Sequence, residues 1–236
     1  MVSSGRRTDP HARVIVFVDG QNLFKACERT FGSGLVHPIL LARLLSGDRR
    51  LAGTRYYSGI HDPRKEPAQH AQASRRHALM RRTGVTVVER TLRYRWEWGL
   101  DTNPLGRPED HVGETVDARA TPYERPREKG IDLALALDVV DLALRRLMDV
   151  AVIVSSDGDL TEVARMVHDM TRATGRVSVE AAVVNDRRHP VLLEHYDYTH
   201  QIRRNEFEEC RDAFDYRGEL DPTMVALFLR TLSGDR

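Results

Sequence analysis

The chain has 236 residues, of which 41% are hydrophobic and 30% are charged, and its formal net charge is +1. This size and composition are ordinary for one soluble α/β domain with appendages. The two cysteines, Cys27 and Cys210, are too few for a disulfide framework and lack the spacing of a metal site. The polar start, MVSSGRRTDPHA, has no signal-peptide core, and no apolar run reaches membrane-spanning length. We therefore expect a cytoplasmic protein without a membrane partner.

Charge is unevenly distributed along the chain. Residues 43–95 hold 13 Lys and Arg against 4 Asp and Glu, whereas residues 96–236 hold 18 against 28. A basic region beside an acid-rich region is one sign of nucleic-acid binding. On charge alone, a solvated basic helix face explains the basic region equally well.

The first half of the chain alternates apolar runs with polar, helix-like stretches. Residues 14–18 are a β-branched run, which is typical of a buried parallel strand. We expect a flexible N-terminus before it, at 1–12. The pattern after it predicts helices at 23–30 and 38–45, a strand at 54–60, an exposed basic helix at 66–82 and a strand at 85–96.

Residues 97–128 contain four prolines, many charges and little periodicity, so we expect a long, mobile insertion or loop there. The second half then predicts a helix at 131–148 with apolar residues nearly all round, which is typical of a helix packed on both sides. It also predicts strands at 150–154, 177–184 and 198–202, and helices at 160–170, 190–196 and 223–232. Strands alternating with helices predict a parallel sheet that helices cover on both faces.

Aspartates follow two of the most apolar predicted strands. Asp19 ends the strand at 14–18, and Asp157 with Asp159 follows the strand at 150–154. Asp132 lies in the first turn of the helix predicted at 131–148. Sites in open α/β sheets form at the carboxyl ends of strands, where these carboxylates would repel one another. A hard cation such as Mg²⁺ or Mn²⁺ takes oxygen ligands and would relieve that repulsion.

Each of these polar residues also has a purely structural explanation. A turn after a strand would by itself explain Asp19, and a helix cap would by itself explain Asn22. Asp132 can be a favourable acid at a helix N-terminus. Asp159 with Glu162 matches a capping box, so a cap and a ligand are equally good readings of Asp159.

Two further acids of the same helix favour structural roles. Asp141 has Arg145 four residues on, which predicts a surface ion pair. Asp138 lies about 240° round the helix from Asp132, so the two do not share a face. It has no cation at the neighbouring helical positions, and it remains a supporting or structural candidate.

Three segments together resemble the NYN domain, a family of the PIN-like nuclease group that includes the LabA-like proteins. They are VDGQN at 18–22, KGIDLALALD at 129–138 and SSDGDL at 155–160, in the family's order and spacing. The resemblance implies a three-layer PIN-like (Rossmannoid) α/β fold over residues 13–205, with a central parallel sheet flanked by helices. It also implies an acidic pocket that binds Mg²⁺ or Mn²⁺ and cleavage of RNA. A C-terminal helical extension at 206–236 lies outside it.

Carried over position by position, the resemblance makes Asp19, Asp132 and Asp157 the metal ligands, with Asp159 as their catalytic companion. Asn22 matches the motif's amide, and Lys129 matches the basic residue before the helix; both would contact substrate. One departure is SSDGDL, where the family more often has SGDSDF. The acids survive this change, which places Gly158 and Leu160 beside them.

The basic region supplies further candidate contacts to RNA. Arg75, Arg76, Arg81 and Arg82 lie on the helix predicted at 66–82, and Arg93 and Arg95 share one face of a predicted strand. Arginines beside aromatic residues suit a single strand, because guanidinium groups bind phosphates and rings stack on bases. For Trp96 and Trp98, packing against a neighbour or a second subunit is the favoured reading.

The predicted activity is hydrolysis of RNA phosphodiester bonds, in which one or two metal ions activate a water. Such a reaction leaves a 5′-phosphate and a 3′-hydroxyl. An aspartyl-phosphate phosphatase would want an acid two residues after Asp19, where this chain has Gln21. The non-enzyme alternative is an RNA-binding or regulatory module with little or no turnover, and a homo-oligomer is left open.

Overall fold

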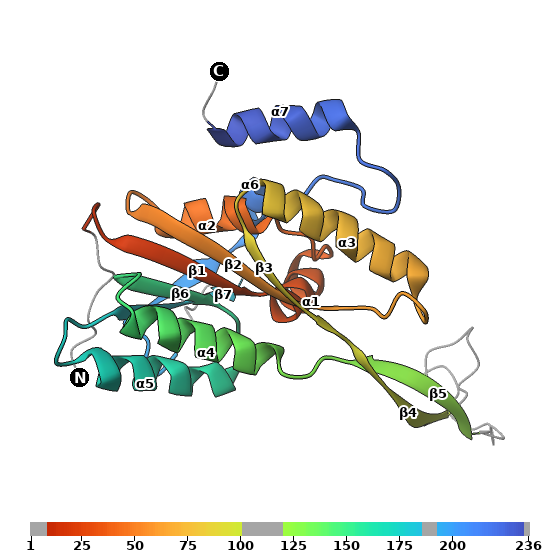
Figure 1. Ribbon diagram of the computed structural model, residues 1–236, viewed down its shortest axis with the longest axis horizontal. Helices are drawn as coiled ribbons and strands as arrows, with labels where there is room; N and C mark the ends of the chain where they lie inside the picture. Colours follow the sequence, from red (N-terminus) through yellow and green to blue (C-terminus); the bar gives the residue numbers. More distant parts are fainter. Residues whose placement is uncertain (1–8, 101–119, 186–192, 234–236) are drawn as a thin grey trace.

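The computed structural model describes residues 9–100, 120–185 and 193–233. A six-stranded sheet lies at its centre, with the strand order β3-β2-β1-β6-β7-β8. Every neighbouring pair in it is parallel. Figure 1 shows helices above and below this sheet, and the α/β PIN-like architecture expected from the sequence is therefore confirmed. The strands are β1 (Arg13–Asp19), β2 (Arg50–Ile60), β3 (Thr86–Thr91), β6 (Val150–Val154), β7 (Ser178–Val184) and β8 (Tyr198–Ile202).

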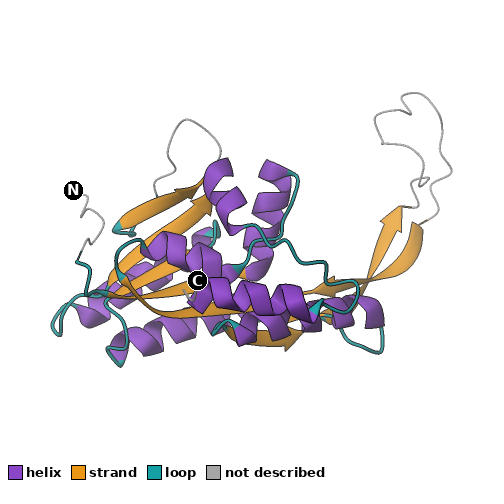
Figure 2. Ribbon diagram, turned by 90° about the horizontal axis from the view of Figure 1, so that it is seen from above, coloured by secondary structure: helices purple, strands orange, loops and turns teal. Residues whose placement is uncertain are grey.

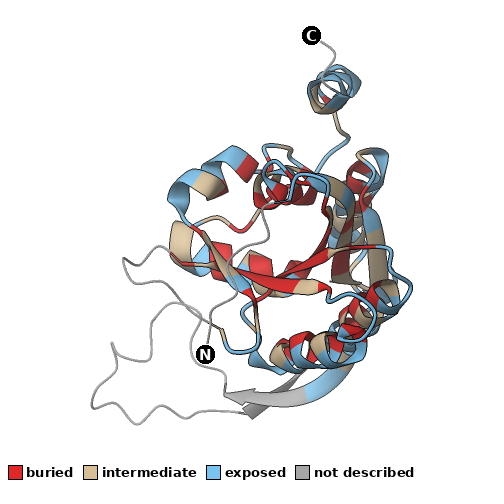
Figure 3. Cartoon of the chain, turned by 90° about the vertical axis from the view of Figure 1, so that its left-hand side faces the viewer, coloured by how far each residue is buried: buried red, intermediate tan, exposed pale blue. Residues whose placement is uncertain are grey.

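Alternate side chains of β1 enter two different cores. Val14, Val16 and Val18 pack on the face covered by α1 (Gly20–Phe31), α2 (Pro38–Ser46), α3 (Pro67–Arg82) and α6 (Arg204–Cys210). Ile15 and Phe17 pack on the opposite face, against α4 (Ile131–Leu144) and α5 (Thr161–Thr171). A strand buried on both faces must be apolar throughout, which is why β1 is a continuous apolar run rather than an alternation of apolar and polar residues. Figure 3 shows the buried residues concentrated in the sheet and on the inner sides of the helices.

The C-terminal helix α7 (Pro222–Ser233) packs through a small cluster of its own. Its buried Val225 joins Leu79 of α3 and Tyr216, while Met224 and Leu227 stay exposed. Figure 2, seen from above, shows α7 lying across the outside of the molecule. None of the described helices combines the length and the apolar character that crossing a membrane requires.

The predicted helices at 23–30, 38–45, 66–82, 160–170 and 223–232 are confirmed within a few residues, as are the strands at 54–60, 150–154, 177–184 and 198–202. Two short helical elements were not predicted, namely α6 and the 3₁₀ turn Gly158–Leu160. The helix expected at 190–196 falls partly outside the described residues, and residues 193–196 form a turn rather than a helix. The expected flexible N-terminus also lies mostly outside the described residues.

The prediction for residues 85–128 was wrong in two ways. The strand expected at 85–96 is interrupted at Leu92, so β3 ends at Thr91 and β4 (Arg93–Leu100) leaves the main sheet. The insertion expected at 97–128 is not a simple loop, because β4 pairs with β5 (Ala120–Arg127) as an antiparallel two-stranded arm. Figure 1 shows this arm projecting from the body. Residues 101–119, between the two strands, lie outside the described residues.

Helix α4 is not packed on both sides as its composition predicted. Leu135 and Val139 are buried against the sheet, but Leu133 and Leu137 are 62% and 60% exposed. The helix covers one face of the sheet and has no second layer outside it among the described elements. An apolar stripe on the solvent side produced the same sequence signature as a fully buried helix.

Candidate active site

Parallel pairing brings the acids of two distant segments to one edge of the sheet. Val18 of β1 is paired with Val154 of β6, so Asp19 and the segment Ser155–Asp157 leave the sheet side by side. Helix α4 begins at the same edge and adds Asp132 in its first turn. A pocket of about 390 Å³ opens there. It is lined by Asp19, Gln21, Asn22, Lys25, Arg125, Pro126, Arg127, Glu128, Asp132 and Asp157.

Asp19 lies at the bottom of this arrangement, 4% exposed. Its Oδ1 accepts the backbone N–H of Asn22 at 3.0 Å, and its Oδ2 accepts the hydroxyl of Ser155 at 3.1 Å. Burial raises the pKa of Asp19, the nearby charges of Asp132 and Asp157 add to that rise, and the two hydrogen bonds oppose it. Asp19 is also the N-cap of α1, so the helix-cap explanation holds for Asp19 rather than for Asn22.

Asp132 and Asp157 face the same pocket from the two neighbouring elements. The pKa of Asp132 is raised by burial and then by the charges of Asp157 and Asp159. Oδ1 of Asp157 accepts the backbone N–H of Asp159 at 3.0 Å, which caps the 3₁₀ turn. Asp159 itself is exposed and does not line the pocket, and α5 has no side-chain cap. The capping-box reading of Asp159 is therefore wrong.

Glu128 is a fourth acid of the pocket that the sequence reasoning missed. Burial raises its pKa to about 7, and the charges of Asp19 and Asp132 contribute to the rise, while a backbone hydrogen bond from Gly59 opposes it. Its Oε1 is buried and has no hydrogen-bond partner among the described residues. Glu128 was assigned to the loop at 97–128, and its place directly before Lys129 and the helix acid was the signal that could have identified it.

The donor set of this pocket fits a hard divalent cation. Four carboxylates share one cavity, and three of them have a pKa raised partly by their neighbours' charge. The unpartnered Oε1 of Glu128 adds a free oxygen donor. Within the described ranges, however, no three His, Cys, Asp or Glu side chains converge closely enough to hold an ion between them. Mg²⁺ commonly takes only one or two protein carboxylates and completes its shell with water and substrate phosphate.

The two remaining motif residues are placed differently. Asn22 lines the pocket, but its Oδ1 accepts the backbone N–H of Ser156 at 3.0 Å and the Ser156 hydroxyl at 2.9 Å. This amide therefore joins α1 to the segment after β6, and only its NH₂ group is left for a substrate. Lys129 is exposed and does not line the pocket. Lys25, which was not predicted, does line it.

None of the four arginines of α3 lines the pocket. Arg75 donates to the carbonyls of Tyr216 and Arg217 at 2.9 and 2.8 Å. Arg81 pairs with Glu89 at 2.9 Å, and Arg82 is exposed.

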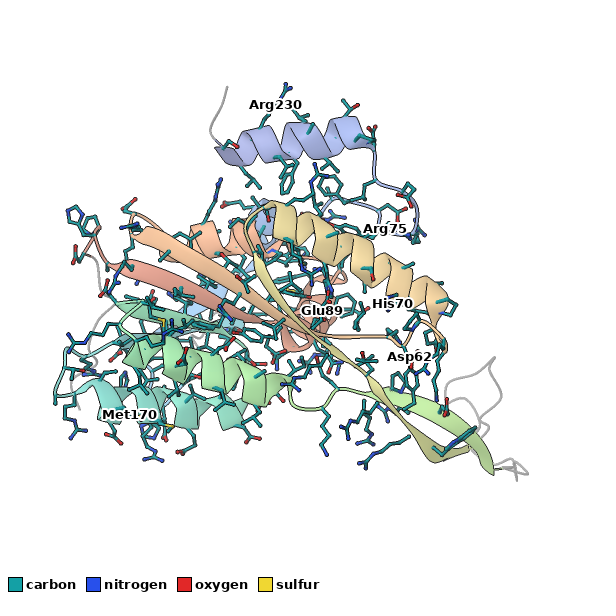
Figure 4. All side chains as sticks on the ribbon, viewed as in Figure 1. Asp62, His70, Arg75, Glu89, Met170 and Arg230 are labelled. Atoms are coloured by element: carbon teal, nitrogen blue, oxygen red, sulfur yellow. The ribbon has the colours of Figure 1, made fainter. Side chains whose placement is uncertain are left out.

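Arg76 is the most buried of these arginines, with its side chain 14% exposed. It donates to the carbonyl of Val36 at 3.0 Å and lies 3.6 Å from the carboxylate of Asp212. Like Arg75, it holds the C-terminal segment against the domain. Figure 4 shows Arg75 on α3, between this helix and the segment that leads to α7.

Arg93 and Arg95 are both exposed on the β4–β5 arm. Trp96 is 69% exposed, so it does not pack against a neighbour among the described elements, and packing against a second subunit stays a prediction. The side chain of Trp98 lies outside the described residues. Sequence reasoning missed Arg125 and Arg127, which the arm brings to the pocket.

Asp138 and Asp141 of α4 both bond to other side chains outside the pocket. Oδ2 of Asp138 accepts the hydroxyl of Tyr57 and the Nη2 of Arg55, each at 2.7 Å. Burial and the hydrogen bond to Asp138 raise the pKa of Tyr57, so this phenol remains protonated. Asp138 therefore ties α4 to β2, and the predicted surface pair of Asp141 with Arg145 is confirmed at 3.1 Å.

Comparison with known proteins agrees with this architecture. No curated protein matched the chain. Among solved structures, a protein of unknown function from Vibrio parahaemolyticus matches with a TM-score of 0.50 at 15% identity, covering 85% of this chain and 98% of that one. That likeness shows a shared fold. The model of the NYN domain family matches residues 13–187, and the chain belongs to this family.

Proposed function

We propose that the chain is a metal-dependent ribonuclease that hydrolyses RNA phosphodiester bonds at the acidic pocket. One observation carries this proposal: Asp19, Glu128, Asp132 and Asp157 come from three separate segments of the chain and line one cavity. Membership of the NYN domain family supports it, because this is a family of nucleases. Cationic residues at the same cavity, namely Lys25, Arg125 and Arg127, suit a phosphate.

Mg²⁺ or Mn²⁺ would bind at Asp19, Asp132 and Asp157, directly to one or two of these carboxylates and through water to the rest, and Asp159 would orient that water. A bound divalent cation supplies a more acidic water and stabilises the charge that develops on the phosphate. The chain's own residues prepare this step. Ser155 and the backbone N–H of Asn22 orient the Asp19 carboxylate and favour its ionised form over the protonated one, because both donate to it.

Glu128 is placed to act as a general base in this reaction. Its pKa of about 7 lets the carboxylate gain and lose a proton near neutral pH, and its Oε1 has no hydrogen-bond partner among the described residues. We assign Glu128 the role of accepting a proton from the attacking water. The side-chain NH₂ of Asn22 and the ammonium of Lys25 would bind phosphate oxygens.

The test is a cleavage assay on single-stranded and structured RNA with Mg²⁺, Mn²⁺ or a chelator. Asp19→Asn and Asp157→Asn should abolish cleavage while the fold is retained. Asp141→Asn is the matched control, because it makes the same change at an exposed ion pair and should cleave like the wild type. Products should carry a 5′-phosphate and a 3′-hydroxyl. Full activity in the Asp19 or Asp157 variant, or activity that survives the chelator, would refute the assignment.

The second candidate is an RNA-binding or regulatory module with little turnover. One observation favours it: within the residues that the structure describes, no three metal-binding side chains already converge on one point. The same assay separates the two functions. A chain that binds RNA but leaves it intact in every metal tested is a binding module, and the pocket is then a recognition site.

A further inference from the structure

Four arginines lie face to face on the β4–β5 arm. The antiparallel register places Arg93 opposite Arg127 and Arg95 opposite Arg125. Directly opposed residues point to the same side of a two-stranded sheet, and so do residues two apart on one strand. All four side chains therefore occupy one face of the arm, and all four residues are exposed. We call this set the arginine face.

Such an arrangement concentrates positive charge on one face of the arm. Like charges directly opposite each other on neighbouring strands repel, with side chains only about 5 Å apart at their Cβ atoms. Two such pairs in succession, about 7 Å apart along the strands, concentrate positive charge on a small area. This positive surface attracts a polyanion, because an arginine can bind phosphate oxygens through parallel N–H donors.

The opposite face of the arm is used for attachment to the domain. The hydroxyl of Tyr94 lies 3.1 Å from Nδ1 of His61, and Lys65 lies over the Tyr94 ring at 4.6 Å. Lys65 also bonds Glu124 of β5, at 2.6 Å to Oε2. In Figure 4, Asp62 marks the segment before α3 to which these contacts hold the arm. Because these contacts fix one face, the arginine face is held toward the other side.

The arginine face is continuous with the acidic pocket. Arg125 and Arg127 line that pocket, and Arg93 and Arg95 extend the same positive surface across to β4. At the end of β5 the chain passes directly into Glu128, whose carboxylate lies in the pocket. A strand whose phosphodiester reaches the acids therefore has its neighbouring phosphates beside the arginines.

We propose that the β4–β5 arm is a binding surface for single-stranded RNA, which it holds by a run of phosphates next to the one at the acidic pocket. This inference rests on the proposed function and specifies its substrate, an RNA strand long enough to lie on the pocket and the arm together. The face is two strands wide and follows one nucleic-acid backbone, whereas a duplex presents two. Phosphate contacts of this kind add affinity and register without reading base sequence.

The experiment measures binding without turnover. Labelled single-stranded RNA of two lengths, one long and one limited to a few nucleotides, and a duplex of the long sequence are titrated in chelator over a range of salt. The arm variant is Arg93→Gln/Arg95→Gln, which leaves the pocket-lining arginines in place. The matched control is Arg165→Gln/Arg172→Gln, which removes one exposed arginine from α5 and one from its C-cap. Thermal melts check that both variants remain folded.

We expect the arm variant to bind the long single strand about 10-fold or more weakly, and to lower the salt slope by about 1.4, since each lost phosphate contact removes about 0.7 for single strands. The few-nucleotide RNA and the control variant should bind as in the wild type. An equal loss in the control variant, an unchanged salt slope in the arm variant, or an effect confined to the duplex would overturn the proposal. An arm variant that binds poorly although the wild type never cleaves RNA would refute the nuclease function and leave the arm's role standing.

Discussion

Ser155 donates its hydroxyl hydrogen to Oδ2 of Asp19 at 3.1 Å, although 136 positions separate the two residues in the chain. The same Ser155 oxygen accepts the backbone N–H of Asp157 at 3.1 Å. One buried hydroxyl therefore orients both Asp19 and the turn that carries Asp157.

Replacing Ser155 with alanine tests this relationship. The hydrogen bond lowers the pKa of Asp19, so Ser155→Ala should raise that pKa and move the acidic limb of the pH–rate profile to higher pH. It should also cost about 1–3 kcal/mol of stability, because a buried carboxylate loses a donor. Ser178→Ala is the control, since Ser178 donates to Asp197 at 3.1 Å away from the pocket. An acidic limb that stays in place in Ser155→Ala would show that this bond does not tune the reaction.

Glu128→Gln should change how stability depends on pH. The pKa of Glu128 is about 7 in the folded chain against 4.5 in the unfolded one, so the folded state binds the proton more tightly. The stability that this group contributes is fully present below pH 4.5 and is lost as pH rises through about 7. In chelator, the wild type should therefore lose about 1–3 kcal/mol more than Glu128→Gln between pH 4.5 and 8. Denaturant unfolding at several pH values measures the difference.

A control for that experiment is Glu162→Gln, because the side chain of Glu162 is 67% exposed on α5 and pairs with Arg165 there. It should follow the wild-type curve. If Glu128→Gln and the wild type run parallel across this range, the pKa of Glu128 is not raised in the folded chain.

Divalent cations should stabilise the fold without any RNA present. Mg²⁺ or Mn²⁺ that binds only the folded pocket raises the melting temperature by mass action. At an ion concentration about 100 times the dissociation constant, the free energy of unfolding increases by about 2.7 kcal/mol. Asp157→Asn should lose most of this shift, whereas Asp141→Asn should keep it. Differential scanning calorimetry at fixed ionic strength makes the comparison, and equal shifts in both variants would place the ion elsewhere.

Gly20→Ala should destabilise the chain, because α1 begins in close contact with β2. A Cβ atom at Gly20 would lie 2.4 Å from the Tyr56 ring and 2.8 Å from the backbone oxygen of Tyr57. Overpacking of this kind costs about 1–3 kcal/mol. At Gly53 the nearest atoms to such a Cβ are 3.9 Å away, so Gly53→Ala should stay within about 0.5 kcal/mol of the wild type. Urea unfolding of the Gly20→Ala and Gly53→Ala variants measures the difference. Equal stabilities would contradict the close approach of α1 to β2.

Arg76→Ala should act on stability rather than directly on RNA. Arg76 faces the buried Asp212, which also accepts the hydroxyl of Tyr216 at 3.0 Å. Removing one partner of a buried pair leaves an uncompensated charge and costs about 3–5 kcal/mol. The exposed Arg82 is the control, and Arg82→Ala should unfold like the wild type. An Arg76→Ala chain that keeps its stability but binds RNA poorly would restore the substrate role predicted for Arg76.

Much of the fold follows from local pattern alone. The β-branched runs of β1 and β6 need burial on both faces, and that requirement predicts a parallel sheet between helix layers before any contact is known. Asp19, Asp132 and Asp157 were identified for the same reason, because each follows a strand or opens a helix at an end where sites form.

The tertiary structure decided what local pattern cannot express. Arg125 and Arg127 lie in a proline-rich stretch without periodicity, and the pairing of β5 with β4 is what places them beside the pocket. Arg75 and Arg76 resemble surface arginines in sequence. Their partners are 141 and 136 residues away, and only the folded structure identifies them. A sequence gives the charge and spacing of a side chain, whereas its role depends on which distant groups desolvate it and bond it.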